Sequence, residues 1–226
     1  MKTGIVFHEL YLWHHTGNHA DYVPYGFPVE PFIHSENSDT KRRVKNLMEV
    51  SGLYEKLHKI NPRKATKDEI LYFHTEDHFN HIKSLNTSIS IDTGISTPSG
   101  IGSFDIALLS VGGVIEALDC VIDRKVDNAY ALVRPPGHHA MPDKAMGFCI
   151  FGNAAIAGKH AINKRNLKKI AFVDWDVHHG NGTQAAFYED PTALTISIHQ
   201  DRNFPTNSGF VSENGEGKGS GYNINI

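Results

Sequence analysis

The stretch DWDVHHGNGT, residues 174–183, places two carboxylates and two imidazoles within six positions. Side chains alternate along a β-strand, so Asp174, Asp176 and His178 are predicted to project from the same face of a strand. Two carboxylates held close together raise one another's pKa, and a bound cation would relieve that repulsion. Oxygen and nitrogen ligands without a thiolate suit zinc, iron(II) or manganese. The alternative interpretation is a solvated strand end with a capping histidine.

A second motif, RPPGHHA at residues 134–140, contains a tandem histidine pair. Two prolines stiffen the approach to the pair, and Gly137 permits an unusual backbone turn. If a carboxylate or an amide orients each ring, His138 and His139 can transfer protons. Two ordinary loop histidines are the alternative, which the metal-like cluster nearby disfavours.

Two aromatic residues are candidate walls of a pocket. Phe148 follows Gly147 in MGFC (146–149), and Phe204 lies in SIHQDRNFP (197–205). Ordinary core packing explains each of these motifs equally well when it is taken alone. Cys149 is not expected to be a nucleophile, because no dedicated base other than the histidine pair accompanies it.

The order of the expected elements brings these motifs together. Hydrophobic patterning predicts alternating strands and helices, which indicate an α/β fold, a parallel sheet with helices on both faces. Ligands in such folds bind beyond the carboxyl ends of the strands, and each histidine-rich motif follows a strand. A capping box of Thr66 and Glu69 marks one helix start. The expected strands are 3–9, 128–133, 169–176, 193–200 and 222–226, the expected helices are 39–51, 67–72, 75–85, 104–122, 153–163 and 183–189, and 11–38 is an expected long loop.

Composition narrows the class of protein. The 226 residues, 40% apolar and 21% charged, are enough for a single domain spanning 1–226. The net charge of -3 provides no basic footprint for nucleic acid, and the N-terminus resembles neither a signal peptide nor a membrane span. Only two cysteines, Cys120 and Cys149, are present, which favours a reducing compartment and a cytoplasmic protein. Neither a nucleic acid nor a membrane is therefore an expected partner.

RPPGHHA, MGFC, DWDVHHGNGT and SIHQD, in this order and spacing, resemble the zinc-dependent histone deacetylase family. The RPPGHH and HHGNG variants look like its class II branch, and the bacterial histone deacetylase-like and acetylpolyamine amidohydrolases are the most similar group. The resemblance runs from about residue 4 to the last residue. It implies the arginase/deacetylase fold and an enzyme that removes acetyl or other acyl groups from amines.

The resemblance assigns catalytic roles to four residues. His138 and His139 match the tandem pair, and His139 is the better candidate for general base and acid. Asp174 matches the carboxylate that orients His138. Asn181 stands where class II members have Asn, and would orient His139.

The resemblance also assigns binding roles. Asp176 and His178 match two ligands of a Zn²⁺ ion, for which Fe²⁺ or Co²⁺ are alternatives. Gly147, Phe148 and Phe204 match the residues that line the acyl-lysine tunnel. His179 is given no catalytic role. A structural K⁺ site would use the carbonyls of Asp174, Asp176, His178 and Ile198 with the hydroxyl of Ser197.

Two expected segments of the family pattern are missing. The family has a third metal ligand, an Asp in a GFD…DP segment, and an oxyanion-stabilising Tyr or His in a GGY-like segment. Neither occurs here, and Asp190 and Asp201 lie in the wrong motifs. The chain is therefore expected to be the N-terminal portion of a deacetylase domain, truncated at the C-terminus, with weak metal binding and poor turnover. A non-catalytic acyl-amine binder is the first alternative, and a two-manganese ureohydrolase-like enzyme is a weaker one.

The substrate and the assembly stay open at this stage. Acetyl-lysine in a peptide or protein, an acetylpolyamine and a small acylated metabolite all offer an alkyl chain and an amide. Acidic side chains at the mouth of the site would favour polyamines, which are cations. A homo-oligomer is a further possibility, in which the 11–38 loop caps a neighbouring site. The acidic residues available for such a mouth are Asp21, Glu30, Glu36 and Asp92.

Overall fold

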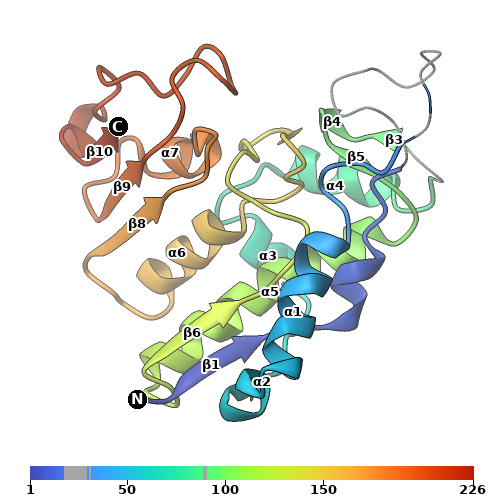
Figure 1. Cartoon of the computed structure of the whole chain (residues 1–226). Helices are drawn as coiled ribbons and strands as arrows, with labels where there is room; N and C mark the ends of the chain where they lie inside the picture. The colour runs from blue at the N-terminus through green and yellow to red at the C-terminus, as the bar shows by residue number, and fades with distance from the viewer. Residues whose placement is uncertain (18–29, 31, 89–90) are drawn as a thin grey trace.

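This computed structural model describes residues 1–17, 30, 32–88 and 91–226 and contains two three-stranded parallel sheets (Figure 1). The first sheet has the strand order β2-β1-β6 and the second has the order β10-β9-β8. The arrows of β6 and β8 point the same way in Figure 1, so both sheets end towards one rim. The strands are β1 (Thr3–Val6), β2 (His58–Ile60), β6 (Asn128–Ala131), β8 (Ile170–Asp174), β9 (Ala193–Ser197) and β10 (Asn223–Asn225).

The helices follow the predicted order with shifted ends. The expected helix at 183–189 begins at Asn181, and the one at 67–72 is only a single turn. The first residues of the expected 11–38 loop belong to a 3-10 helix, and 18–29 and 31 lie outside the described residues. The helices are η1 (Glu9–Trp13), α1 (Asp39–Val50), α2 (Leu53–Lys56), α3 (Lys67–Ile70), α4 (Glu76–Ser84), α5 (Ser103–Ile122), α6 (Asn153–Asn163), α7 (Asn181–Phe187) and η2 (Gly217–Gly219).

Short strands between these elements form two further pairs. An antiparallel pair joins β3 (Ile91–Asp92) to β5 (Pro98–Ser99). A parallel pair joins β4 (Gly94–Ile95) to β7 (Ala145–Met146). The second pair fixes the MGFC segment against residues 94–96, because the amides of Gly147 and Phe148 donate to the carbonyls of Ile95 and Ser96.

Helix α5 is the centre of the hydrophobic core. Its side chains pack against β1 and β6 in one cluster and against α6 in another. Val111 and Ile115 are fully buried. Gly112 lets α5 pack closely against the backbone at Arg63, since a Cβ at Gly112 would lie 1.9 Å from the Arg63 carbonyl oxygen. The predicted α/β class, with parallel strands and packed helices, is confirmed.

The second sheet has two unlike faces. Phe172 and Ile170 pack against Ala155 and Phe187 of α6 and α7. The opposite face carries exposed Val173 and Ile224, and exposed apolar residues just past the strand ends extend it. These are Trp175, Ile198 and Ile226.

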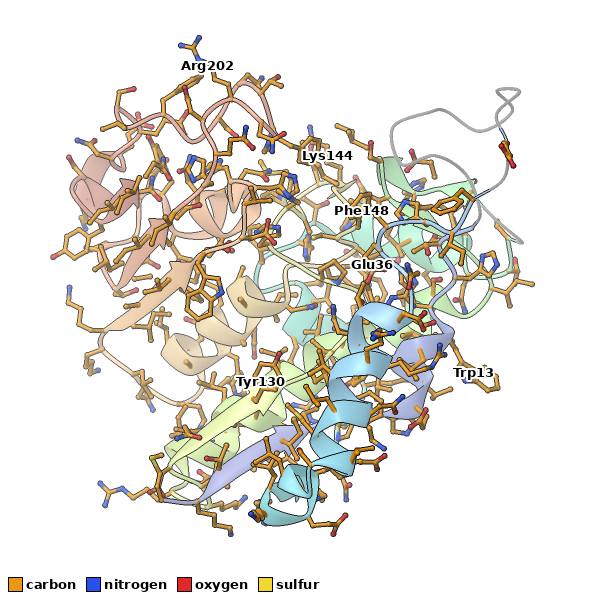
Figure 2. All side chains as sticks on the ribbon, in the orientation of Figure 1. Trp13, Glu36, Tyr130, Lys144, Phe148 and Arg202 are labelled. Atoms are coloured by element: carbon orange, nitrogen blue, oxygen red, sulfur yellow. The ribbon has the colours of Figure 1, made fainter. Side chains whose placement is uncertain are left out.

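A buried ion pair attaches the 34–36 segment to the end of β6. The Arg134 guanidinium donates to both carboxylate oxygens of Glu36, at 2.8 and 2.9 Å. It also donates to the carbonyls of Tyr11 and His14 and to Thr16 Oγ1. Arg134 therefore joins three separate segments just before the tandem histidines. Glu36 is buried, whereas Trp13 is exposed and projects from the surface in Figure 2.

Replacing Arg134 with Met is expected to lower the free energy of unfolding by about 3–5 kcal/mol, because Glu36 keeps a buried charge without its partner. Urea unfolding followed by circular dichroism measures the loss. The double variant Arg134→Met/Glu36→Leu should regain much of it. A loss below about 1 kcal/mol in the single variant would contradict the role given to the pair.

The predicted capping box is confirmed. Thr66 Oγ1 accepts from the Glu69 amide, and the Glu69 carboxylate accepts from the Thr66 amide. Arg63 also donates to both carboxylate oxygens. Burial opposes ionisation of Glu69, but the hydrogen bonds and charge of Arg63 and the Thr66 amide outweigh it and lower its pKa to about 2.

Because the folded-state pKa is depressed, Glu69 stabilises the fold above its ordinary pKa of 4.5 and loses that effect as pH falls towards 2. Glu69→Gln should therefore be less stable than the wild type by up to about 3 kcal/mol at pH 7, and nearly equal to it near pH 2. Denaturant unfolding across this range measures the difference. Exposed Glu76 supplies the control, because Glu76→Gln should change stability by less than about 1 kcal/mol throughout.

Candidate active site

Asp174, Asp176 and His178 occupy a turn rather than one face of a strand. Strand β8 ends at Asp174, two residues earlier than predicted. Asp174 Oδ1 then accepts from the Asp176 amide at 3.1 Å, and Asp176 Oδ1 accepts from the His178 amide at 2.8 Å. Each carboxylate thus satisfies the amide two residues on, as in Asx turns. The three side chains do lie in one cluster, but these turns bring them together, not the alternation of side chains along a strand.

A carboxylate orients the first histidine of the tandem pair. His138 Nδ1 donates to Asp174 Oδ2 at 2.8 Å, as the resemblance implies. Burial raises the pKa of Asp174, but its hydrogen bond with His138 and the charge of that ring outweigh the effect and keep the pKa below its usual value. An ionised Asp174 can only accept at this contact, so it fixes the tautomer and the orientation of the His138 ring.

A neutral amide orients the second histidine. His139 Nδ1 lies 2.8 Å from Asn181 Oδ1, which can only accept, so Nδ1 carries the proton. Asn181 is the first residue of α7, and the amide of Gly182 donates to the carbonyl of His138 at 2.8 Å. A Cβ at Gly182 would lie 2.2 Å from the carbonyl oxygen of Ala140. Glycine there lets the helix start directly against the tandem pair.

His139 is the more buried imidazole, with 3% of its surface exposed. Its ring centroid lies 3.9 Å from that of His138. Burial, and then the nearby charge of His138, lower the pKa of His139 to about 3. His139 is therefore neutral at pH 7, with an unprotonated Nε2.

Asp176 and His178 are the two side chains in the cluster that could hold a metal ion. Asp176 Oδ1 and His178 Nδ1 lie 3.1 Å apart, and His138 Nε2 is 3.9 Å from the same carboxylate oxygen. The carboxylate is about half exposed and His178 about a quarter exposed. These donors suit zinc in type, and zinc in catalytic sites normally has three protein ligands. Within the described part of the chain, no group of three His, Cys, Asp or Glu side chains could hold a metal ion.

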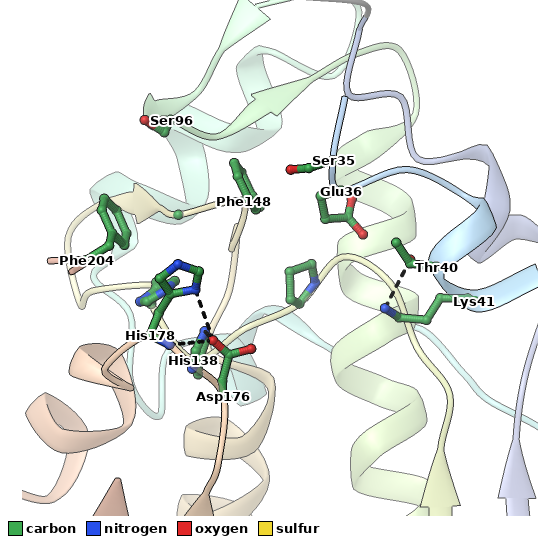
Figure 3. Close-up of a pocket in the computed structure, with 13 residues that line it drawn as sticks. Ser35, Glu36, Thr40, Lys41, Ser96, His138, Phe148, Asp176, His178 and Phe204 are labelled. Carbon is green, nitrogen blue, oxygen red and sulfur yellow. Dashed lines mark hydrogen bonds and ion pairs between the residues drawn. The ribbon is translucent and has the colours of Figure 1, made fainter. Parts of the chain in front are cut away.

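These residues border a cavity of about 260 Å³ (Figure 3). Phe148 and Phe204 lie above His178 and His138, while Thr40 and Lys41 lie at the other side. The Phe204 ring contacts that of His139 edge-on, with 4.9 Å between centroids. The lining comprises Ser35, Glu36, Thr40, Lys41, Ser96, Pro136, His138, His139, Gly147, Phe148, Asp176, His178 and Phe204.

The MGFC segment adopts a strained local conformation at this cavity. Gly147 and Phe148 have φ angles of 54° and 68°. A Cβ at Gly147 would lie 2.4 Å from the His139 ring and 2.8 Å from Phe204, so only glycine fits. The Cys149 thiol is fully buried, which raises its pKa, and it donates to the Gly147 carbonyl. These findings agree with the prediction that Cys149 is not a nucleophile.

The cavity also has a wall that the sequence motifs do not reveal. This wall comes from distant parts of the chain, and no local pattern indicates that it meets the histidines; it consists of Ser35, Glu36, Thr40, Lys41 and Ser96. Of the three acids considered for the mouth that the structure describes, Glu36 alone lines the cavity, and Arg134 binds its carboxylate. Asp92 instead accepts from the amides of Gly94 and Thr97 in a turn, Glu30 is exposed, and Asp21 lies outside the described residues.

Ser197 and Ile198 meet the 174–180 turn from β9. The Ile198 amide donates to the Asp174 carbonyl at 2.8 Å, and Ser197 Oγ accepts from the Gly180 amide at 3.3 Å. His199 Nε2 faces the Gly209 carbonyl, so its Nδ1 accepts the Ser197 hydroxyl proton.

His179 lies apart from the cavity lining. Only 1% of its surface is exposed, and its ring nitrogens bond to Ser208 and Gln184. These contacts agree with the structural role expected for this residue.

Comparison with known proteins identifies the family. The histone deacetylase domain model matches residues 34–226. A histone deacetylase-like amidohydrolase of Pseudomonas aeruginosa is 43% identical over all of this chain and 60% of its own length, and a probable deacetylase of Archaeoglobus fulgidus is 38% identical over all of this chain and 59% of its own length. The chain thus spans about three fifths of these relatives.

The solved structure of the HDA15 HD domain matches all of this chain and 61% of that one, with a TM-score of 0.89 and 33% identity. This likeness confirms the arginase/deacetylase fold implied by the sequence motifs. No helix in the described ranges is both long and apolar enough to cross a membrane. The family model, the relatives and the fold agree, and the chain belongs to the histone deacetylase family.

Proposed function

We propose that this protein is a metal-dependent amidohydrolase that removes acetyl or other acyl groups from N-acylated amines. The observation that carries the proposal is the tandem histidine pair, in which a carboxylate orients one ring and an amide orients the other. Both rings line one cavity with Asp176 and His178, whose side chains are of the types that bind metal ions. Asp176 and His178 would hold Zn²⁺, with Fe²⁺ or Co²⁺ as alternatives. A bound metal of this kind polarises an amide carbonyl and acidifies a bound water.

The two histidines have different roles: His139 carries out both proton transfers, and His138 supports the developing charge. His139 lines the cavity and is neutral with Nε2 unprotonated, so this nitrogen would accept the proton of the attacking water. The same ring, once protonated, returns a proton to the leaving amine. His138, which is oriented by ionised Asp174, would support the developing negative charge on the substrate.

The cavity walls favour an unbranched alkyl amine. Phe148 and Phe204 would enclose the alkyl chain and exclude water, and Gly147 presents only backbone to the amide. Acetyl-lysine in a peptide, an acetylpolyamine and a small acylated metabolite all fit this description. The Glu36 carboxylate is paired with Arg134, so it is not available to favour a cationic polyamine.

A structural K⁺ ion is part of the proposal. It would bind the carbonyls of Asp174, Asp176, His178 and Ile198 and the Ser197 oxygen, whose own proton points to His199. This cation would hold the turn that carries Asp176 and His178. We further propose that the protein is cytoplasmic, in keeping with its free, buried cysteines, Cys120 and Cys149. A homo-oligomer is one form that its assembly could take.

A non-catalytic acyl-amine binder is the second candidate. The observation that favours it is the lack of a third metal-type side chain at the cluster within the described residues. A binder would retain affinity for acetylated amines without releasing acetate.

Replacing His139 with Asn should lower kcat for an acetyl-lysine peptide by about 100- to 10,000-fold with little change in KM, because it removes the general base. Acetate release from acetyl-lysine peptide, acetylputrescine and a small N-acetyl amine provides the measurement. Partly buried His58, which lies in β2 and not in the cavity lining, supplies a control of the same type, His58→Asn, which should keep wild-type turnover. Equal turnover in His139→Asn and the wild type would rule out the proposed base.

Replacing Asp176 with Asn should weaken Zn²⁺ binding at least about tenfold, because a neutral amide is a poorer ligand than a carboxylate. Isothermal titration of the metal-free protein measures the affinity. The matched control is Asp201→Asn, since Asp201 is an exposed carboxylate away from the cavity lining. Identical Zn²⁺ affinity in Asp176→Asn and the wild type would place the metal elsewhere.

A further inference from the structure

Two methionine sulfurs lie near the amide nitrogen of Asn181, the residue that orients His139. Met141 Sδ lies 3.0 Å from Asn181 Nδ2, and Met146 Sδ lies 3.7 Å from the same nitrogen. Met141 is held in place by a bridge between its backbone and that of Lys144. The opposite end of the amide, Asn181 Oδ1, contacts His139 Nδ1 at 2.8 Å.

A thioether discriminates between the two orientations of an asparagine amide. Its sulfur accepts hydrogen bonds weakly and has no proton to donate. The NH₂ group can therefore face Met141 favourably, whereas the carbonyl oxygen would meet a second set of lone pairs. The observed orientation satisfies both ends, because Asn181 Nδ2 also faces the His139 carbonyl at 3.3 Å.

The orientation of this amide selects the tautomer of His139. With Oδ1 facing the ring, Nδ1 must carry the proton and Nε2 has a free lone pair on the cavity side. A reversed amide would present NH₂ to Nδ1, which would then have to accept. The proton would move to Nε2, and that nitrogen could no longer accept a proton from water.

Packing alone does not fix the amide. Asn181 borders a second cavity of about 410 Å³, and Met141, Met146 and Gln184 line it with Asn181. Both methionines are only half-buried. Asn181 itself is buried, but the hydrogen-bonding character of the neighbouring atoms decides which way its amide points.

We propose that Met141 is a positioning residue whose thioether sulfur fixes the Asn181 amide and thereby the base-competent tautomer of His139. The inference rests on the proposed function only for its catalytic consequence. The tautomer itself is a property of this chain, and can be measured without turnover.

The test compares two substitutions of similar length at one position. Met141→Leu keeps the apolar volume and removes the sulfur acceptor, leaving the more distant His139 carbonyl, whereas Met141→Glu introduces a side chain that, when ionised, can only accept. Ring ¹⁵N shifts of His139 at pH 7.5, assigned with a His139→Asn variant, report which nitrogen is protonated. We expect one Nδ1-protonated form in the wild type and in Met141→Glu, and a mixture of tautomers in Met141→Leu.

Met146→Leu is the matched control, because its more distant sulfur should not be required for a single tautomer. Thermal unfolding of every variant confirms that it is folded at the temperature of the NMR measurement. A single Nδ1-protonated form in Met141→Leu would overturn the proposal. So would a mixture in Met141→Glu equal to that in Met141→Leu, since packing rather than hydrogen-bond acceptance would then be responsible.

Steady-state kinetics adds a readout of the catalytic consequence. In a catalytically active wild type, Met141→Leu should lower kcat about three- to tenfold, the effect of one modest hydrogen bond, with KM unchanged. Unchanged kcat despite mixed tautomers would overturn the link from Met141 to catalysis. A wild type without turnover would count against the proposed function, whereas the NMR result would still decide the role of Met141.

Discussion

The hydrogen bond between His139 and Asn181 is the contact on which the proposed chemistry depends. A buried imidazole beside a second histidine could accept its ring proton on either nitrogen. Asn181 Oδ1 settles the choice, and burial keeps the ring neutral. The partner of His138 is the Asp174 carboxylate instead of an amide, and this chemical difference separates the roles of two adjacent, otherwise similar rings.

The fold supplies the positions for these partners. Asp174 ends strand β8 and Asn181 begins helix α7, so the turn between them sets both orienting groups at once. Gly180 and Gly182 let this turn approach the tandem pair, where a Cβ would meet Asp174 or the Ala140 carbonyl. On the far side, Arg134 ties the segment bearing Glu36 to the chain just before Pro135. The cavity is therefore enclosed by contacts between segments widely separated in sequence.

Much of the site was predictable from the sequence, because its residues occur in short motifs next to strand ends. The orienting partners of His138 and His139 and the aromatic wall at Phe204 all lie where the motifs indicate. The strand alternation proposed for Asp176 and His178 was wrong, because side chain to backbone hydrogen bonds end β8 early. Arg134, Lys41 and Met141 were not identified, since their contacts depend on tertiary packing and no local periodicity encodes them.

The central claim is that these residues hydrolyse an amide with the help of a metal ion. Its most direct test is acetate release from an N-acetylated alkyl amine by the zinc-loaded protein, by the same sample after chelation, and after zinc is restored. The account predicts acetate and free amine in equal amounts, loss of turnover on chelation, and recovery with zinc. Binding of the acetylated amine without acetate release from the zinc-loaded protein, or turnover unaffected by chelation, would contradict it.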